Sequence, residues 1–160
     1  MMSKLYISDT KIAKQKPYIY CICIQHPTAF AYIGQSAQKR GVLGRVTGHL
    51  GTDGTLMKRV KKAGVSNFEN MTVVAMDLTE YSIFDGLYSR SRDALEFLIH
   101  SAMKAKGCKA HIPFEVISYV ANCSLVHDVK IQKIAEEVTQ KICDEIPFFS
   151  IEPAKGGVVL

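Results

Sequence analysis

Cysteine is sparse and unpatterned in this sequence. The five cysteines form an odd, scattered set without a CxxC pair. This pattern argues against a disulfide framework and predicts a reduced, cytoplasmic location. Cys108 and His111 have the spacing of half a zinc site. Because no second pair follows at a suitable distance, we interpret the cysteines as packing residues.

Long apolar runs, low-complexity linkers and internal repeats are also absent. No run reaches the roughly 18 apolar residues of a membrane-spanning helix, so no membrane partner is predicted. Residues 1–16 are polar and interrupted by charge, unlike a signal peptide. The 160 residues, 48% of them hydrophobic, suit one domain with a sizeable core. We expect an N-terminal extension over 1–16, a core over 17–110 and a C-terminal helical addition of unassigned role over 111–160.

Two β-branched and aromatic runs, Tyr18–Ile24 and Phe30–Ile33, are separated by a short polar connector. They predict a β-hairpin. Alternation along the first run defines two faces, one with Tyr18, Tyr20, Ile22 and Ile24 and the other with Ile19, Cys21 and Cys23. Since both faces are apolar, this strand is predicted to be central and covered on both sides.

The remaining elements follow from hydrophobic periodicity. Helical patterns cover 37–50, 55–63, 91–106 and 126–146, with glycines ending the first three, and Met71–Met76 reads as a strand. Phe114–Val120 fits either a strand or the start of a buried helix. The predicted fold is α/β (α+β): a small, mostly antiparallel central sheet that starts with a β-hairpin, is flanked by helices and carries a C-terminal helical addition.

Acidic residues are nearly missing between Lys39 and Lys62, where Asp53 is the single acid. The net charge is only +5, but seven cations fall in this stretch, namely Lys39, Arg40, Arg45, Lys58, Arg59, Lys61 and Lys62. Such clustering is typical of a surface that faces nucleic-acid phosphates, although a solvated helix face is the simpler alternative.

A few residues could carry chemistry. Tyr20 and Tyr32 lie one on each strand of the hairpin, where packing is the ordinary role of tyrosine. Arg45 and His49 are four apart and share a helix face. The glycines beside them, Gly44 and Gly48, each cost a helix about 1 kcal/mol, which indicates close approach of a phosphate or of the sheet.

Glu96 lies at the edge of the apolar stripe of the 91–106 helix. A carboxylate in that position is a reasonable ligand for a hard cation such as Mg²⁺. Alternatively, Asp93 caps the helix and Glu96 completes a capping box three residues on.

Between about Pro17 and Lys106 the sequence resembles the GIY-YIG nuclease family. The resemblance lies in the order of Tyr20, Tyr32-Ile33-Gly34, Arg45, His49 and Glu96. The YIG tripeptide is intact, and Arg45 and His49 keep the family spacing. Tyr18 stands where the family has its first glycine. No asparagine follows Glu96 at about a dozen residues, and His111 is the nearest candidate to replace it.

The resemblance implies a phosphodiester-hydrolysing site. Glu96 would hold Mg²⁺, or another divalent cation such as Mn²⁺, and Arg45 would contact the phosphoryl oxygens. Tyr20 is favoured as the base, with Tyr32 orienting water or phosphate and His49 supporting the site. Tyrosine has a reference pKa of about 10, so the base role requires nearby cations to lower it.

We therefore expect a metal-dependent endonuclease acting on double-stranded DNA, of the restriction or mobile-element type. Lys39, Arg40, Lys58, Arg59, Lys61 and Lys62 would contact the DNA backbone. A homodimer would follow if both strands of a palindrome are cut. Two alternatives stay open: a non-catalytic nucleic-acid-binding module of the same fold, and a protein-interaction domain in which the tyrosines are core.

Overall fold

The computed structural model describes residues 9–25, 28–65, 68, 70–87, 89–107 and 112–146. Within them the strands are β1 (Tyr18–Gln25), β2 (Ala29–Ser36), β3 (Asn70–Asp77) and β4 (Phe114–Val116). The α-helices are α1 (Gly41–Leu50), α2 (Thr55–Lys62), α3 (Arg90–Gly107) and α4 (Val129–Glu145). Short 3-10 turns are η1 (Thr10–Ala13), η2 (Ser82–Phe84) and η3 (Ser124–His127).

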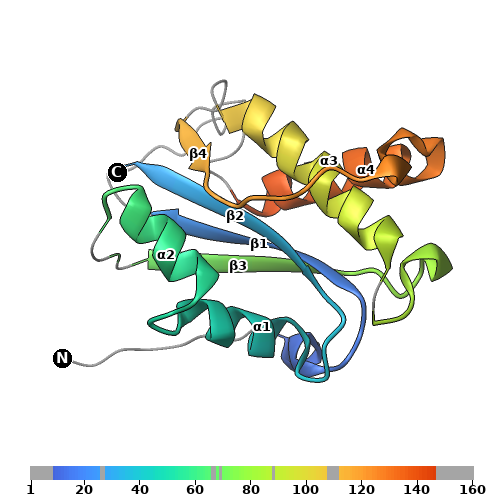
Figure 1. The fold of residues 1–160 in the computed structure, drawn as a ribbon, viewed down its shortest axis with the longest axis horizontal. Helices are drawn as coiled ribbons and strands as arrows, with labels where there is room; N and C mark the ends of the chain where they lie inside the picture. Colours follow the sequence, from blue (N-terminus) through green and yellow to red (C-terminus); the bar gives the residue numbers. More distant parts are fainter. Residues whose placement is uncertain are drawn as a thin grey trace, which may run out of the picture.

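The strands form one sheet in the order β3-β1-β2-β4 (Figure 1). β1 pairs antiparallel with both β2 and β3, whereas the short β4 runs parallel to β2. The predicted fold class is confirmed, including the opening hairpin, the flanking helices and the C-terminal helix. β1 lies in the interior of the sheet, as its two apolar faces predict.

The sheet separates two hydrophobic clusters. On one face β1 packs with α1 and α2 through Tyr18, Tyr20, Ile22, Ile24, Val42, Val46, Leu56 and Val60. On the other face β1 packs with α3 and α4 through Ile19, Cys21, Cys23, Leu95, Ile99, Ile134 and Val138. The predicted strand faces are confirmed, and the sheet is the middle of three layers (Figure 1).

One strand differs from the sequence-based expectation, and another decides between two alternatives that the sequence left open. β2 does not stop at Gly34 but continues to Ser36, because Gly34 pairs with Tyr20 in the β1 ladder. Phe114–Val116 is a strand and not the start of a helix. Its short ladder with β2 is extended by a hydrogen bond of 2.9 Å from Ile117 N to Ala31 O.

The starts of α3 and α4 also differ from the sequence-based expectation. Asp93 lies inside the first turn of α3, so it is not the N-cap and the capping-box alternative for Glu96 is wrong. Ser89 accepts a bond from Arg92 N instead. α4 begins at Val129 after η3, and Val129 is 63% exposed. The helix therefore starts three residues later than the predicted residue 126, and its first residue lies outside the buried side of α4.

The part of the chain that the structure describes contains no helix long and apolar enough to cross a membrane. Cys21, Cys23, Cys123 and Cys143 are free thiols, three of them buried. Both β4 and α4, from the predicted C-terminal addition, join the sheet or its core.

Candidate active site

The five candidate catalytic residues come from four elements and meet beside the sheet. Tyr20 of β1 and Tyr32 of β2 share the face that α1 covers. The Tyr20 hydroxyl is 3.0 Å from His49 Nε2 of α1, and the rings of Tyr32 and His49 lie 5.0 Å apart between centroids. The charges of Arg45 and Glu96 both act on the two tyrosines.

Gly34 makes room for the Tyr20 phenol. The two residues are cross-strand partners, and a Cβ built on Gly34 would lie 2.5 Å from Tyr20 Cζ. Any larger residue would displace the ring, because the clash is with the phenol itself and the ring is 1% exposed. The glycine of the YIG tripeptide therefore holds Tyr20 within reach of His49.

His49 is buried and neutral at physiological pH. Burial, and then the charge of Arg45, lower the pKa of His49 to about 4. A neutral imidazole has one nitrogen that accepts a hydrogen bond. Since the phenol of Tyr20 keeps its proton, Tyr20 Oη donates to His49 Nε2 in the tautomer that carries the ring proton on Nδ1.

Both tyrosines are protonated as well. Burial raises the pKa of Tyr20 and of Tyr32 above the ordinary value, and the charge of Arg45 offsets only part of that effect. Arg45 lowers the pKa of both tyrosines, as the base role requires, but without metal or DNA it does not bring either value below the ordinary one. Desolvation outweighs the cation because Arg45 itself is exposed to solvent.

Glu96 is a partly buried carboxylate without a hydrogen-bonding or ion-pair partner among the described residues. Burial, and then the charge of Asp93, raise the pKa of Glu96 to about 7, while Arg45 acts in the opposite direction. The described residues contain no group of three or more His, Cys, Asp or Glu side chains that could hold a metal. This donor set does not suit zinc, but it suits Mg²⁺, which needs one or two carboxylates and completes its shell with water and substrate phosphate.

A hollow of about 280 Å³ opens beside the site. Its lining comes from α1, the turn after it and the start of α2, namely Gln38, Gly44, Arg45, Gly48, His49, Asp53, Gly54 and Thr55. A Cβ added to Gly48 would meet nothing within 4 Å, so close packing against the sheet does not explain this glycine. A larger hollow, about 580 Å³, lies between α1, β3 and α4 and contains none of the five candidate residues.

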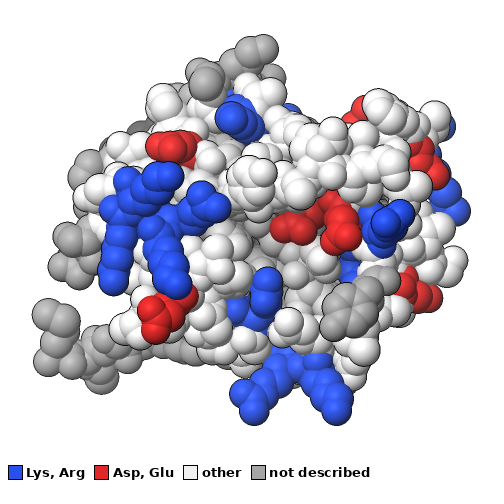
Figure 2. Space-filling view, in the orientation of Figure 1, with Lys and Arg blue, Asp and Glu red and all other residues white. Residues whose placement is uncertain are grey.

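The predicted DNA-contacting cations lie on α2 and at the start of α1, the two helices that line the hollow of about 280 Å³. Lys58, Lys61 and Lys62 are exposed on α2, whose opposite face buries Leu56 and Val60. Figure 2 shows the basic side chains gathered over α2. Lys39 and Arg40 are exposed at the start of α1, and Arg59 is partly buried.

Sequence reasoning missed Arg92, one turn before Glu96. Its side chain is 1% exposed and donates to the backbone carbonyls of Phe84, Gly86 and Leu87 and, at 3.0 Å, to Gln35 Oε1. Arg92 therefore joins the end of β2 to the loop before α3 and fixes the start of the helix that carries Glu96. Its only sequence signal is that an arginine occupies the apolar side of that helix.

His111, the predicted replacement for the family asparagine, and Cys108 lie outside the described residues. Comparison of the chain with protein-family models, with curated proteins and with solved structures finds no significant match. Evidence for function therefore rests on the geometry of the site.

Proposed function

We propose that this protein is a metal-dependent DNA endonuclease with a GIY-YIG-type active site, and that it acts on double-stranded DNA in the cytoplasm. One observation carries the proposal: residues as far apart as Tyr20 and Glu96, selected by their order in the chain, converge on one site. A packing role for the tyrosines alone would not require a neutral histidine, an exposed arginine and a carboxylate that pairs with no described residue beside them.

Glu96 would hold the divalent ion, Mg²⁺ or Mn²⁺. Such an ion supplies Lewis-acid charge at the phosphate and helps the leaving oxygen. A cation next to Glu96 also compensates the carboxylate for its lost hydration, which favours the ionised form at neutral pH. Glu96 is the carboxylate of the five candidate residues, and its charge acts on both tyrosines.

Arg45 would bind the phosphoryl oxygens. Arg45 and Gly48 both line the hollow of about 280 Å³, and Gly48 presents bare backbone there. A planar fork of donors suits the charge that develops on a phosphate during hydrolysis. Once a phosphate neutralises Arg45, the cation that lowers the pKa of His49 is offset, and His49 becomes a better base.

Tyr20 and His49 together would remove the proton from the attacking water. As Tyr20 Oη takes up that proton, it passes its own to His49 Nε2 along the 3.0 Å hydrogen bond. The pair avoids a free phenolate, which burial disfavours. Tyr32, whose ring lies against His49, would orient the water or the phosphate.

The decisive experiment is cleavage of supercoiled plasmid with Mg²⁺ or Mn²⁺. Glu96→Gln should lower the nicking rate by about 100-fold or more, since removal of a metal ligand or charge stabiliser costs several kcal/mol. Glu136→Gln, an exposed change on α4 on the other face of the sheet, is the matched control and should keep the rate. Equal rates for wild type and Glu96→Gln would contradict the proposal.

Arg45→Ala should abolish cutting while leaving the thermal unfolding temperature close to that of wild type, because Arg45 is exposed. Lys133→Ala, exposed on α4 across the sheet, is the control that removes a cation outside the proposed DNA-contacting set, and it should keep the rate. A loss of the folded state on Arg45→Ala would make Arg45 structural instead.

A non-catalytic nucleic-acid-binding module is the second candidate, favoured by the exposed lysines of α2, which are independent of Glu96. Salt-sensitive DNA binding without cleavage, across varied sequences and both metals, would select this module. Restriction-type or mobile-element use, and a homodimer that cuts both strands, belong to the endonuclease proposal.

A further inference from the structure

We propose that Tyr119 and Arg59 form a stacking platform for an unpaired nucleobase beside the candidate active site. The inference rests on the proposed function, since it names the form of DNA that the site accepts. Tyr119 is 76% exposed and is the one aromatic among the highly exposed large apolar residues of the described part of the chain. The guanidinium of Arg59 lies over its ring, 5.8 Å from the centroid.

Exposure of a single tyrosine is ordinary. The stronger evidence for a binding role is the fixed backbone that presents Tyr119. The segment before Tyr119 is bonded to β2 and α3 at three points. Ile117 N donates to Ala31 O at 2.9 Å, Ile33 N donates to Ser118 Oγ at 3.1 Å, and His100 Nε2 donates to Ser118 O at 3.0 Å. A ring presented by a fixed backbone loses little conformational entropy when a flat ligand stacks on it.

These bonds also connect the platform to the site. Ile33 follows Tyr32 in β2, and His100 lies one helical turn after Glu96 in α3. On the other side, the charge of Arg59 lowers the pKa of Tyr32 against the effect of burial. Tyr119 therefore stands between the helix that carries Glu96 and the basic helix α2.

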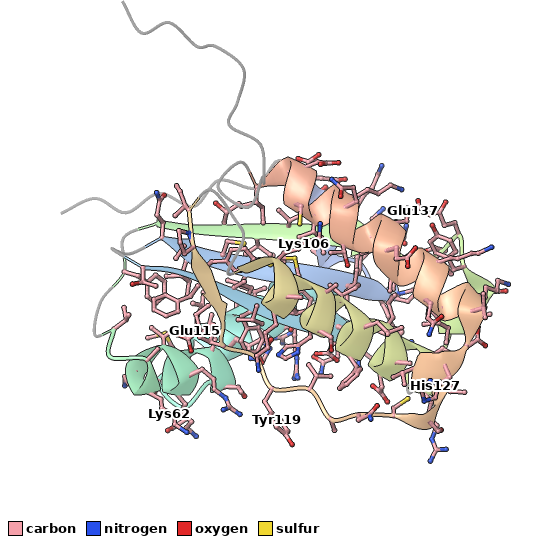
Figure 3. All side chains as sticks on the ribbon, turned by 90° about the horizontal axis from the view of Figure 1, so that it is seen from above. Lys62, Lys106, Glu115, Tyr119, His127 and Glu137 are labelled. Carbon is pink, nitrogen blue, oxygen red and sulfur yellow. The ribbon has the colours of Figure 1, made fainter. Side chains whose placement is uncertain are left out.

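The surroundings favour a nucleic-acid base over an apolar partner. Tyr119 points away from the body of the fold on the same side as Lys62 (Figure 3). Lys58, Lys61 and Lys62 are exposed next to Arg59 on α2. A strand of DNA whose phosphates follow α2 would bring a base to the tyrosine, where an aromatic ring and a guanidinium both offer a flat face.

Stacking on an exposed ring requires a base with a free face. Bases inside a duplex have both faces covered by their neighbours, so the platform would select DNA that is single-stranded, frayed or locally unpaired at the cutting site. We infer that the enzyme binds the strand to be cut with one base unstacked next to the phosphate held by Arg45.

The test measures binding in EDTA, which separates it from catalysis. Two fluorescent oligonucleotides of equal length are compared, one of thymidines and one of abasic sugar-phosphates. Wild type should bind the thymidine strand more tightly than the abasic strand. Tyr119→Ala should weaken binding of the thymidine strand by about 5- to 100-fold and leave the abasic strand unchanged, while Tyr119→Phe should match wild type.

Equal effects of Tyr119→Ala on both strands, or no effect on either, would overturn the platform. The same would follow from a wild type that does not prefer the thymidine strand. Plasmid nicking that depends on Glu96 but not on Tyr119 would leave the endonuclease proposal standing alone. Base-dependent binding without nicking would support the platform and reject the endonuclease.

Discussion

At the scale of single residues, the candidate site depends on the pairing of a glycine with a tyrosine. Tyr20 and Gly34 face each other across β1 and β2, and the missing side chain of Gly34 is the space that the phenol occupies. This arrangement directs the hydroxyl to His49. Since Gly34 pairs with Tyr20 in the ladder, strand β2 continues through this glycine to Ser36.

Gly34→Ala should therefore damage the site more than the fold. The added methyl group forces the Tyr20 ring out of place, with a cost of about 1–3 kcal/mol in the free energy of unfolding. We expect the nicking rate to fall at least tenfold, because the bond to His49 is lost.

Gly51→Ala is the matched control, because its new Cβ makes only an ordinary contact, 3.5 Å from Gly48 O, and Gly51 does not line the hollow. This variant should keep the wild-type nicking rate. Wild-type nicking and unfolding temperature in Gly34→Ala would show that the close contact with Tyr20 is unimportant.

Ionisation of Glu96 should lower the free energy of unfolding at neutral pH relative to acidic pH, where its carboxyl group is protonated. In the folded protein its pKa is about 7, above the ordinary 4.5. The folded state thus binds the proton more tightly, and the free energy of unfolding falls as the pH rises from about 4.5 to about 7. Glu96→Gln cannot ionise, so it should exceed wild type by about 1–3 kcal/mol at pH 8 and match it at pH 4.

Denaturant unfolding of both proteins across this pH range measures the difference. His49, with its pKa lowered to about 4, acts in the opposite sense, but it is present in both proteins and cancels. At pH 8, millimolar Mg²⁺ should raise the unfolding temperature of wild type only, because binding to the folded state stabilises it. A Glu96→Gln protein less stable than wild type at pH 8 would indicate a structural role.

At the scale of elements, α2 has two faces with different tasks. Leu56 and Val60 bury one face against the sheet, and exposed lysines occupy the other. Because the apolar face holds α2 against the sheet, the lysines of the opposite face are free to bind a polyanion.

Replacing Lys58, Lys61 and Lys62 with glutamine should weaken DNA binding without unfolding the protein. Each lost phosphate contact reduces the slope of log affinity against log salt by about 0.9, so a change of about 2–3 is expected from titrations at several salt concentrations. Lys130→Gln with Lys133→Gln, exposed on α4 across the sheet, should leave the slope unchanged. Equal effects of both sets would mean that only net charge matters.

At the scale of the whole molecule, the C-terminal helix completes the core. Ile131, Ile134, Val138 and Ile142 of α4 are buried in the cluster that contains Ile19, Cys21 and Cys23 of β1. Without this cover one face of the central strand would meet water. Although α4 was predicted as an addition, it shares its hydrophobic cluster with the strand that carries Tyr20.

Ile131→Ala should consequently lower the stability of the entire fold by about 2–5 kcal/mol, in one cooperative transition. Val129→Ala, two residues away and 63% exposed, should change it by less than about 0.5 kcal/mol. Circular dichroism and tyrosine fluorescence during thermal unfolding give the comparison. Separate transitions for the two probes would show that α4 unfolds independently.

Local sequence patterns were sufficient for much of this fold. Alternation in Tyr18–Ile24 predicted a covered central strand, and glycines after helical runs predicted the ends of α1 and α3 to within one residue. These features depend on backbone period and near neighbours, which the sequence displays directly. The order of Tyr20, Tyr32, Arg45, His49 and Glu96 likewise selected residues that meet.

Tertiary structure alone decided the electrostatics and the long-range bonds. The raised pKa values of Tyr20 and Glu96 come from desolvation by packed neighbours, which no local pattern encodes. The hydrogen bond from Arg92 to Gln35 and the contact of Arg59 with the Tyr119 ring join segments far apart in the chain. Such contacts exist only once the strands and helices have packed, and they determine what the site can bind.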